Sequence, residues 1–496
     1  MTRRLFLLTG LLVAMATTAN AQQREEALQW PTPRPEAKAG TRWWWLGSAV
    51  DRENLRWNLS EYARTGIGAV EITPLYGVQG NDRNNIPFLS PQWMEALRTV
   101  EDIGRETGIQ IDMNCGTGWP FGGPTVKIAE AAGKLVTKTD VLTADGTTQL
   151  TFGVGSPEAN ATLSKVMAYK DDEAVDVTAY IEGSTLRWTA PAGEWRIIAV
   201  YNGHTLQQVK RAAPGGEGWV IDHFDREAVK HYLDRFEQAF AQSGVPYPNT
   251  FFNDSYEVYK ANWTPTLFDE FLKRRGYDLR QHLPELLGVA DDGNQVLCDY
   301  RETLSDLLLE NFTRQWVGWA HKHGVQVRNQ AHGSPGNLLD LYGVVDIPEI
   351  EGFGLSEFGI RGLRTDPGKT RRNYSDLSML KYASSASHTG GKPLASCETF
   401  TWLTEHFRTS LSQFKPDLDL IFCAGINRVF FHGTCYSPVD DPWPGWKFYA
   451  SGVTPRSSRN IWNAARVSFN GASRTMTSLS ICRSTTCGSA AKRACL

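Results

Sequence analysis

The segment Thr41–Gly77 reads "TRWWWLGSAVDRENLRWNLSEYARTGIGAVEITPLYG" and holds two apolar runs with a helix-like stretch between them. The first run is "TRWWWLG" and the second is "GIGAVEITPLYG", and polar or glycine-rich residues follow each of them. Short apolar runs that alternate with amphipathic stretches are typical of β-α-β units in a parallel sheet. The segment therefore predicts a strand, a helix and a second strand parallel to the first.

The same alternation continues along the chain. A third run, "GIQIDMNCGTGWPFGG" at 108–123, follows a helix-like stretch in which Ser90 is the expected N-cap, Pro91 the first helical residue and Gly108 the C-cap. Five further runs come later, namely "NTFFNDSYEV" at 249–258, "VQVRNQAHG" at 325–333, "VVDIPEIEGFG" at 344–354, "KPLASCETFTW" at 392–402 and "INRVFFHGTCYSP" at 426–438. Three runs and five runs make eight strands, so we expect an α/β fold of the (β/α)8 barrel type.

Residues 134–220 interrupt this pattern. Stretches such as "KLVTKTDVLTADGTTQLTF" and "STLRWTAPAGEWRIIAVYNGH" alternate in steps of two and turn at Asp-Gly and Ala-Gly. Such alternation predicts an antiparallel β domain inserted after the third barrel strand. We therefore expect the barrel in two parts, at 22–133 and 221–450, with the inserted domain at 134–220.

The N-terminal segment "MTRRLFLLTGLLVAMATTANAQQ" begins with Arg3 and Arg4, continues with an apolar run from Leu5 to Ala16 and ends in small residues before Gln22. This pattern is typical of a secretory signal peptide at 1–21. The apolar run is short for a bilayer span, and no later run is longer. We expect an exported protein, periplasmic or extracellular, without a membrane span.

The composition bears on the class of partner. The formal net charge is -3, which gives no electrostatic reason to expect binding to nucleic acid or to an anionic membrane surface. Aromatic residues make up 11% of the chain and include 17 tryptophans, whose faces can stack on sugar rings, although most are expected to be core residues. A neutral glycan fits this composition.

The three tryptophans of the first run would lie near the end of a barrel strand where active sites are built. Because alternation along a strand turns successive side chains to opposite faces, at least one of Trp43, Trp44 and Trp45 should point into the barrel and another outward. We expect one of them to contact a sugar and the others to pack beneath the helices.

Polar residues gather at the ends of the predicted strands. They are Glu71, Asp112, Asn114, Asn253, Asp254, Glu257, Asn329, His332, Glu349, Glu351, Glu398 and His432. Solvated salt bridges at a barrel mouth would explain single residues, but the number of carboxyl groups favours a site. Two carboxyl groups across a pocket suffice for glycoside hydrolysis, while calcium sites and proton-abstracting enzymes use the same groups. The sequence contains no HExxH, GxSxG or P-loop motif.

Several strings together resemble the α-L-rhamnosidases of glycoside hydrolase family 106, in order from about Gly40 to Ala450. They are "RWWWLG", "GAVEITPLYG", "DMNCGTGWPFGGP", "FFNDSYEV", "IPEIEGFG", "CETFTW" and "FFHGTCYSP". The resemblance implies an exported bacterial enzyme with a divided (β/α)8 catalytic domain, an inverting mechanism and calcium in the active site. The implied substrate is a rhamnose-containing oligosaccharide or polysaccharide of plant or bacterial origin.

The resemblance also implies roles for individual residues. Glu257 matches the general acid at the fourth predicted strand, and Glu398 matches the general base on the seventh, across the mouth. Glu349 or Glu351, with Asp254 or His332 as further candidates, is expected either to bind calcium or to hold the sugar hydroxyls. The expected sugar-binding residues are Trp44, Trp45, Glu71, Asp112, Trp119, Asp254, His332 and His432.

The C-terminal residues 451–496 are rich in Ser, Arg, Thr and Cys and have no amphipathic period. The resembled family has a stretch close to "PDNDV.LY.P" near here, and one codon choice for residues 472–483 yields it in another reading frame. We therefore expect a frameshifted or truncated tail. Two other functions remain open, namely a glycosidase for another terminal sugar and a non-catalytic carbohydrate-binding relic.

Overall fold

The computed structural model describes residues 38–290, 293–368, 370–372, 374–401 and 410–438. The predicted signal peptide at 1–21 and the predicted tail at 451–496 lie outside the described residues. Among the helices that the structure describes, none is long and apolar enough to cross a membrane.

The centre of the molecule is a closed barrel in which every neighbouring pair of strands is parallel. Its strands in chain order are β1 (Gly40–Leu46), β2 (Ala69–Leu75), β3 (Gln110–Asn114), β13 (Thr250–Asn253), β14 (Gln326–Asn329), β15 (Ile347–Phe353), β18 (Ser396–Thr401) and β19 (Arg428–Cys435). The order around the barrel follows the chain and closes where β1 pairs with β19. The predicted (β/α)8 barrel is confirmed. β1 begins at Gly40, one residue before its predicted apolar run, and the other seven barrel strands lie inside theirs.

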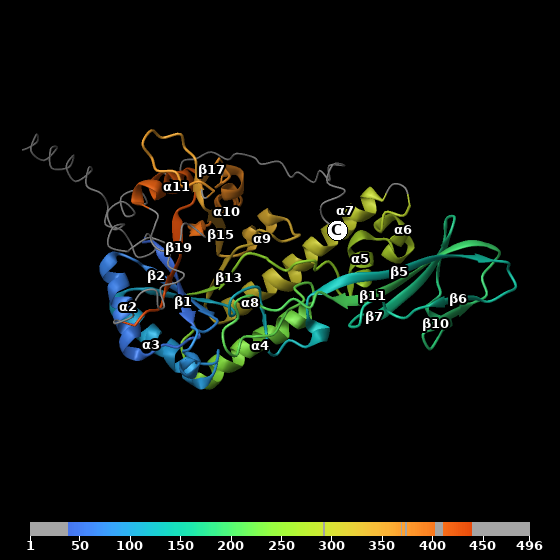
Figure 1. Ribbon diagram of the computed structural model, residues 1–496, viewed down its shortest axis with the longest axis horizontal. Coiled ribbons are helices and arrows are strands. Elements are labelled where there is room, and N and C mark those ends of the chain that lie inside the picture. The colour runs from blue at the N-terminus through green and yellow to red at the C-terminus, as the bar shows by residue number, and fades with distance from the viewer. Residues whose placement is uncertain (1–37, 291–292, 369, 373, 402–409, 439–496) are drawn as a thin grey trace, which may run out of the picture.

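Helices lie outside this barrel (Figure 1). They are α2 (Arg52–Thr65), α3 (Pro91–Thr107), α4 (Arg226–Ser243), α5 (Leu267–Arg275), α6 (Leu283–Leu286), α7 (Asn294–Leu307), α8 (Arg314–Lys322), α9 (Leu338–Val344), α10 (Leu377–Thr389) and α11 (Leu411–Cys423). A π-helical stretch at Leu308–Thr313 joins α7 to α8. The short strands β16 (Leu355–Ser356) and β17 (Thr370–Arg371) pair in the connection that follows β15.

The ends of α3 show why the helix forms where it does. The Ser90 hydroxyl accepts a hydrogen bond from the backbone N–H of Trp93 at 3.3 Å, and Pro91 occupies the first turn. Gly108 ends the helix with a φ of 70°, a conformation that glycine adopts without steric cost. The caps predicted from the sequence are thus confirmed, and they fix where the chain enters β3.

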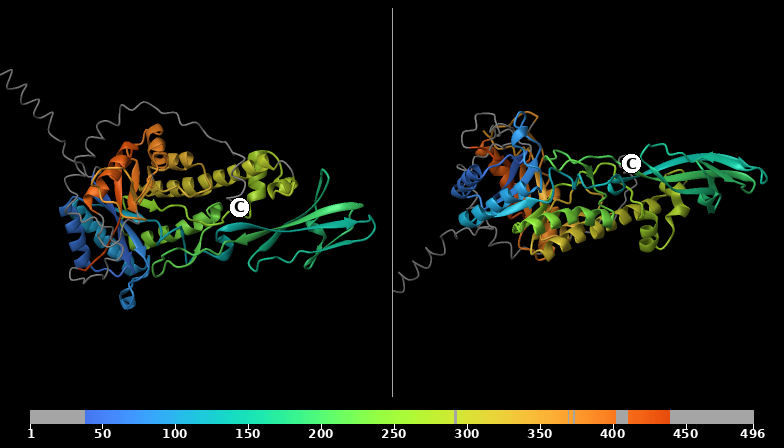
Figure 2. Two further views of the ribbon diagram at one scale, coloured as in Figure 1. Left: turned by 45° about the horizontal axis from the view of Figure 1, so that its top comes forward. Right: turned by 90° about the horizontal axis from the view of Figure 1, so that it is seen from below.

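Between β3 and α4 the chain forms antiparallel sheets that extend away from the barrel (Figure 2). The larger sheet has the order β5-β11-β7-β8 and the smaller one β6-β10-β9. The strands are β5 (Gly133–Ala144), β6 (Leu150–Gly153), β7 (Thr162–Lys170), β8 (Glu173–Asp176), β9 (Ile181–Glu182), β10 (Thr185–Trp188) and β11 (Gly193–His204). They bury a hydrophobic cluster of their own, which includes Phe152 and Trp195. A further antiparallel pair, β4 (Gly122–Gly123) and β12 (Trp219–Val220), joins the segments of the chain before and after these sheets.

The main hydrophobic core lies between the barrel and its helices. The Trp43 ring meets Tyr62 of α2 edge to face at 5.9 Å between centroids, and Trp45 lies 5.9 Å from Trp93 of α3. Burial of such a side chain contributes roughly 1.5–3 kcal/mol. Two of the three consecutive tryptophans therefore stabilise the contact between β1 and the first helices.

Candidate functional site

Alternation along β1 divides the tryptophan run between the two faces of the barrel wall. Trp44 points inward, where its ring meets His432 of β19 at 5.2 Å between centroids and packs in a small cluster with Leu46. Trp43 and Trp45 point outward and are fully enclosed. The expectation that Trp45 contacts a sugar is therefore wrong, because the strand turns its side chain under α3. Trp44 stays a candidate.

The lower part of the barrel interior is an ion-pair network around Arg328 of β14. Its guanidinium donates to Glu349 at 2.5 Å and to Glu71, and it lies 3.8 Å from Asp112. Glu349 also accepts from the hydroxyl of Ser396 at 2.5 Å. All three carboxyl groups are enclosed with no exposed surface.

This network lies toward the N-terminal ends of the barrel strands and has no exposed carboxyl surface. Glu349 pairs with Ser396, the first residue of β18, and Asp112 pairs with Thr250, the first residue of β13. Parallel strands run in one direction, so these side chains belong to the N-terminal half of the barrel. The sugar-binding roles expected for Glu71 and Asp112 are corrected to structural ion pairing, since buried carboxylates need cationic partners.

Two residues further along β18, Glu398 lies in an upper layer that faces the strand ends. Arg42 of β1 places one guanidinium nitrogen 3.3 Å from Glu398 and another 2.8 Å from Asp254. Gln330 donates to Glu398 at 2.7 Å and to Glu349 at 3.0 Å, and so connects the two layers. Thr401 donates a further hydrogen bond to Glu398 at 3.1 Å. Glu398 is thus held in a fixed orientation at the bottom of the mouth.

Glu351 lies beside Glu398, because the register of β15 and β18 pairs the two residues. The Nε2 atom of His332 lies 3.1 Å from the Glu351 carboxylate, and its Nδ1 atom lies 3.2 Å from the hydroxyl of Tyr342. Burial lowers the pKa of His332, although the charge of Asp254 opposes this effect. His332 is therefore neutral at pH 7 and orients Glu351.

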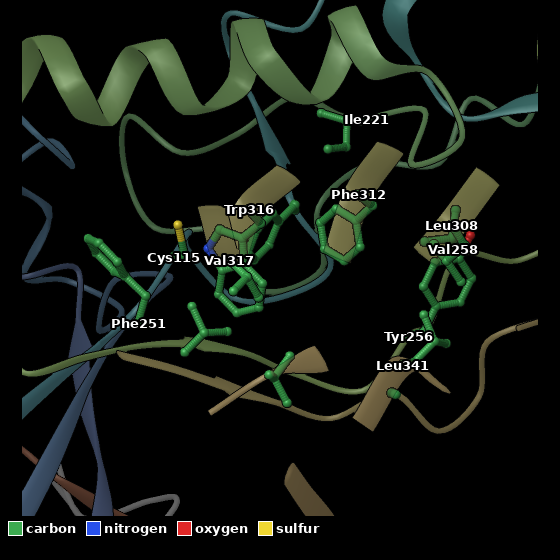
Figure 3. Close-up of a cluster of buried hydrophobic side chains, with 14 of the residues drawn as sticks. Cys115, Ile221, Phe251, Tyr256, Val258, Leu308, Phe312, Trp316, Val317 and Leu341 are labelled. Carbon is green, nitrogen blue, oxygen red and sulfur yellow. The ribbon is translucent and has the colours of Figure 1, made fainter. Parts of the chain in front are cut away.

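The opposite side of the mouth carries Glu257, in the loop just beyond the end of β13. Its neighbours Tyr256 and Val258 are buried in the core, near Leu308 and Leu341 (Figure 3). The backbone N–H of Tyr256 also donates to the carbonyl of His332 at 3.0 Å. These anchors fix the loop, and the Glu257 side chain between them keeps 29% of its surface exposed.

Glu257 is bound by an ammonium group and a phenol. Lys210, from the segment that follows β11, donates to the Glu257 carboxylate, and the Tyr259 hydroxyl donates to it at 2.9 Å. Burial tends to raise the pKa of Glu257, but the hydrogen bonds from Lys210 and Tyr259 outweigh it and hold that pKa below the usual range. In the absence of a ligand Glu257 is thus ionised at neutral pH.

The pKa values of the two deeper carboxyl groups are shifted upward, opposite to that of Glu257. Burial, followed by the charge of Asp254, raises the pKa of Glu351 to about 8. Burial also raises the pKa of Glu398 well above its usual range; Arg42 opposes the rise and the charge of Glu351 adds to it. Adjacent buried carboxylates resist ionising together. The mouth therefore combines one ionised carboxylate at the rim with a proton-retaining pair below it.

The two remaining sugar-binding candidates also lie near the mouth. His432 points inward from β19 with its Nε2 atom 3.8 Å from Glu398, and burial lowers its pKa to about 3, so it is neutral. Trp119 is partly buried against the cluster that contains Trp44. Its backbone pairs with that of Lys210 through hydrogen bonds of 2.8 and 3.2 Å. Trp44, Trp119, Asp254, His332 and His432 are thus all close to the mouth.

The expected calcium ligands do not form a cation site here. Glu349 is already bound by Arg328, Gln330 and Ser396, and Glu351 faces His332. Across the described ranges, no three His, Cys, Asp or Glu side chains converge as a metal site would require. Calcium usually takes six to eight oxygen ligands. The ligand role of Glu349 is corrected to ion pairing, and calcium stays a prediction that rests on the resemblance.

Sequence reasoning missed four residues that shape the mouth, namely Arg42, Gln330, Lys210 and Tyr259. The signal for Arg42 was present, because it lies two residues before Trp44 and therefore on the same face of β1. The signal for Gln330 was also present, because it directly follows a barrel strand, as do several of the polar residues that were predicted to form the site. The sequence held no signal for Lys210, because this residue lies after the inserted sheets and not at the end of a predicted barrel strand.

Comparisons with known proteins agree with this geometry. The model of glycoside hydrolase family 106, described as alpha-L-rhamnosidase, matches residues 31–161 and 149–469. A Formosa agariphila protein with the provisional name beta-glucuronidase is 24% identical in an alignment 463 residues long, which covers 82% of this chain and 38% of that protein. The structure of a rhamnosidase from Novosphingobium sp. PP1Y has a TM-score of 0.70 at 17% identity, and the match covers 89% of this chain and 60% of that one. The chain thus spans less than two thirds of either protein, and the structural likeness shows the fold alone.

Proposed function

The chain belongs to glycoside hydrolase family 106, and from this premise we propose that it releases terminal α-L-rhamnose from glycans with inversion at the anomeric carbon. The observation that carries the proposal is the arrangement of carboxyl groups at two depths of one barrel mouth. Glu257 is 29% exposed at the rim, whereas the side chain of Glu398 is 2% exposed below it. Two carboxyl groups that flank one bond are what glycoside hydrolysis requires.

In the proposed reaction the terminal sugar lies in the deep part of the mouth, above Glu398 and beside Trp44. Glu257 gives a proton to the glycosidic oxygen as the bond to the anomeric carbon breaks. Glu398 first gives its proton to solvent, and its carboxylate then takes a proton from the water that attacks the opposite face of the sugar. Arg42 and Gln330 hold Glu398 for this step through contacts of 3.3 and 2.7 Å.

The depth of the mouth supports release of a terminal unit. The ion-pair layer around Arg328 closes the barrel below Glu398, so a chain cannot thread through it. The side chain of Trp44 and the neutral imidazole of His432 offer an apolar wall for a deoxy sugar. Export to the periplasm or the medium, and a calcium ion that takes part in binding, belong to the proposal on the grounds of the N-terminal sequence and the resemblance.

The proposal is tested with the purified chain and two aryl substrates, 4-nitrophenyl α-L-rhamnoside and 4-nitrophenyl β-D-glucuronide. The glucuronide is included because of the name that the Formosa relative carries. We expect release of nitrophenol from the rhamnoside and loss of most of this activity in Glu398→Gln. The matched control is Glu302→Gln, which changes a glutamate that is 60% exposed on α7.

NMR of the first-formed sugar tests the stereochemistry, and inversion requires β-rhamnose to appear first. Initial formation of the α anomer would replace inversion by retention. Hydrolysis of the glucuronide alone would assign another terminal sugar. Rhamnose binding in calorimetry without turnover of either substrate would identify the carbohydrate-binding relic.

A further inference from the structure

The segment 205–213, which returns from the inserted sheets toward the barrel, is fixed against the loop that carries Glu257. The Gln207 side chain donates to the carbonyl of Glu257 at 2.7 Å and accepts from the backbone N–H of Tyr259 at 2.8 Å. On its other side the segment pairs with Trp119 through the backbone of Lys210. The inserted region thus supplies one wall of the candidate site.

This wall presents an ammonium group and an aromatic face to the solvent side of Glu257. Lys210 donates to Glu257 and to the hydroxyl of Tyr259 at 2.8 Å, and its nitrogen lies 4.5 Å from the centroid of the Tyr259 ring. Tyr259 is 55% exposed although its hydroxyl is bound. An exposed tyrosine ring whose position is fixed by hydrogen bonds can stack on a sugar without further ordering.

The depths of the two carboxyl groups define which part of a substrate meets this wall. If the terminal sugar lies over Glu398, the oxygen that Glu257 protonates is the link to the next unit. The next unit must then extend outward past Glu257. Lys210 and Tyr259 are the side chains that contact Glu257 from that direction.

The charge of the wall indicates the kind of unit that it would bind. Segments 205–213 and 257–259 together contain two cations, Lys210 and Arg211, and one carboxylate, Glu257. The guanidinium of Arg211 lies 5.6 Å from the ring centroid of Trp119, on the same side of the mouth. The net charge of the whole chain is close to zero for its length, but this rim is locally cationic and complements an anion.

We propose that Lys210 and Tyr259 form a subsite for the leaving-group sugar and that this sugar carries a carboxylate. The subsite rests on the proposed function, because it takes Glu257 as the group that protonates the leaving oxygen. The sugar ring stacks on Tyr259, and its carboxylate binds the ammonium of Lys210. Lys210 acts on the reaction through Glu257 and is therefore a positioning residue.

The subsite also explains how an ionised rim carboxylate becomes an acid. A carboxylate that binds Lys210 weakens the ion pair that holds the pKa of Glu257 low. The other groups that face Glu257 are the hydroxyls of Tyr259 and Ser255, the indole of Trp119 and, across the mouth, neutral His332 and Glu351. None of them supplies a cation in place of Lys210. Glu257 then takes a proton from solvent and gives it to the leaving oxygen, which departs as an alcohol.

The test uses two disaccharides that differ in one group, α-L-rhamnosyl-(1→4)-D-glucuronate and α-L-rhamnosyl-(1→4)-D-glucose, with 4-nitrophenyl α-L-rhamnoside as a reference. One charge-assisted hydrogen bond corresponds to a preference of about tenfold or more in kcat/KM for the glucuronate. In Lys210→Met this preference should fall to about one, and the basic limb of the pH profile on the neutral disaccharide should move to higher pH. Lys210→Arg should keep most of the preference.

The matched control is Lys260→Met, which removes one exposed positive charge from the same loop and should keep the preference. Equal kcat/KM for both disaccharides in the wild type, or a preference that survives in Lys210→Met, would overturn the subsite. An equal loss of the preference in Lys260→Met would also overturn the subsite, because the preference would then come from the overall positive potential of the loop and not from a contact with Lys210. Absence of turnover on all three rhamnosides would instead refute the proposed function, so the two failures are distinguishable.

Discussion

Replacement of Arg328 by methionine tests whether the lower barrel layer is held together by charge. The guanidinium contacts Glu349 and Glu71, lies 3.8 Å from Asp112, and is itself fully buried beneath the ring of Phe430 at 3.6 Å. Methionine fills much of the same volume but leaves these carboxylates without their central cation. Removal of one partner from a buried ion pair costs about 3–5 kcal/mol, and we expect the free energy of unfolding of Arg328→Met to fall by this amount at pH 8.

The loss of stability in Arg328→Met should increase as the pH rises. In the wild type Arg328 helps to hold the pKa of Glu349 below its usual value against the effect of burial, so this group stabilises the fold above the pKa of about 4.3 that it has when unfolded. Without Arg328, burial dominates and raises the folded-state pKa of Glu349 above that value. The folded variant then binds the proton more tightly than the unfolded chain, and its stability deficit grows as the pH rises above about 4.3.

Urea unfolding followed by circular dichroism at pH 5 and pH 8 measures this difference. The deficit of Arg328→Met should be clearly smaller at pH 5 than at pH 8. The control is Arg314→Met on α8, where a 53% exposed arginine pairs with Glu310 at 3.0 Å and should contribute at most about 1 kcal/mol at either pH. Equal deficits of Arg328→Met at the two pH values would refute the reasoning, because the loss would then come from packing alone.

Three further predictions concern the mouth and the barrel wall. Trp45→Ala should destabilise the fold by about 3–5 kcal/mol, as measured by urea unfolding. The KM of the enzyme that remains folded should not change, and a raised KM would restore a role for Trp45 in sugar binding. In steady-state assays Glu257→Gln should slow hydrolysis of alkyl rhamnosides far more than that of activated aryl rhamnosides, because only a poor leaving group needs the proton that Glu257 gives. Glu398→Gln should slow both substrates alike, because both need an activated water. The reverse pattern would exchange the two roles. Exhaustive chelation should abolish turnover and added calcium should restore it, and full activity of the chelated enzyme would remove calcium from the proposal.

The sequence was sufficient for the barrel and for the boundaries of its first elements. Apolar runs separated by amphipathic stretches predict parallel strands because both faces of such strands are buried, and all eight runs contain a strand. The caps at Ser90 and Gly108 follow from local backbone chemistry and could be assigned without tertiary contacts. The division of the tryptophan run between the two faces of β1 follows in the same way from the alternation of side chains.

The pairing of charges inside the barrel was decided by tertiary structure. Alternation tells which side chains face inward, but the stagger between strands determines which of them lie at the same height. Glu349 and Glu351 differ in height because they are two residues apart on one strand, and the stagger decides that the first meets Arg328 and the second lies beside Glu398. The contact of Lys210 with Glu257 joins two loops across 47 residues and depends on how the inserted sheets return to the barrel, which no local pattern encodes.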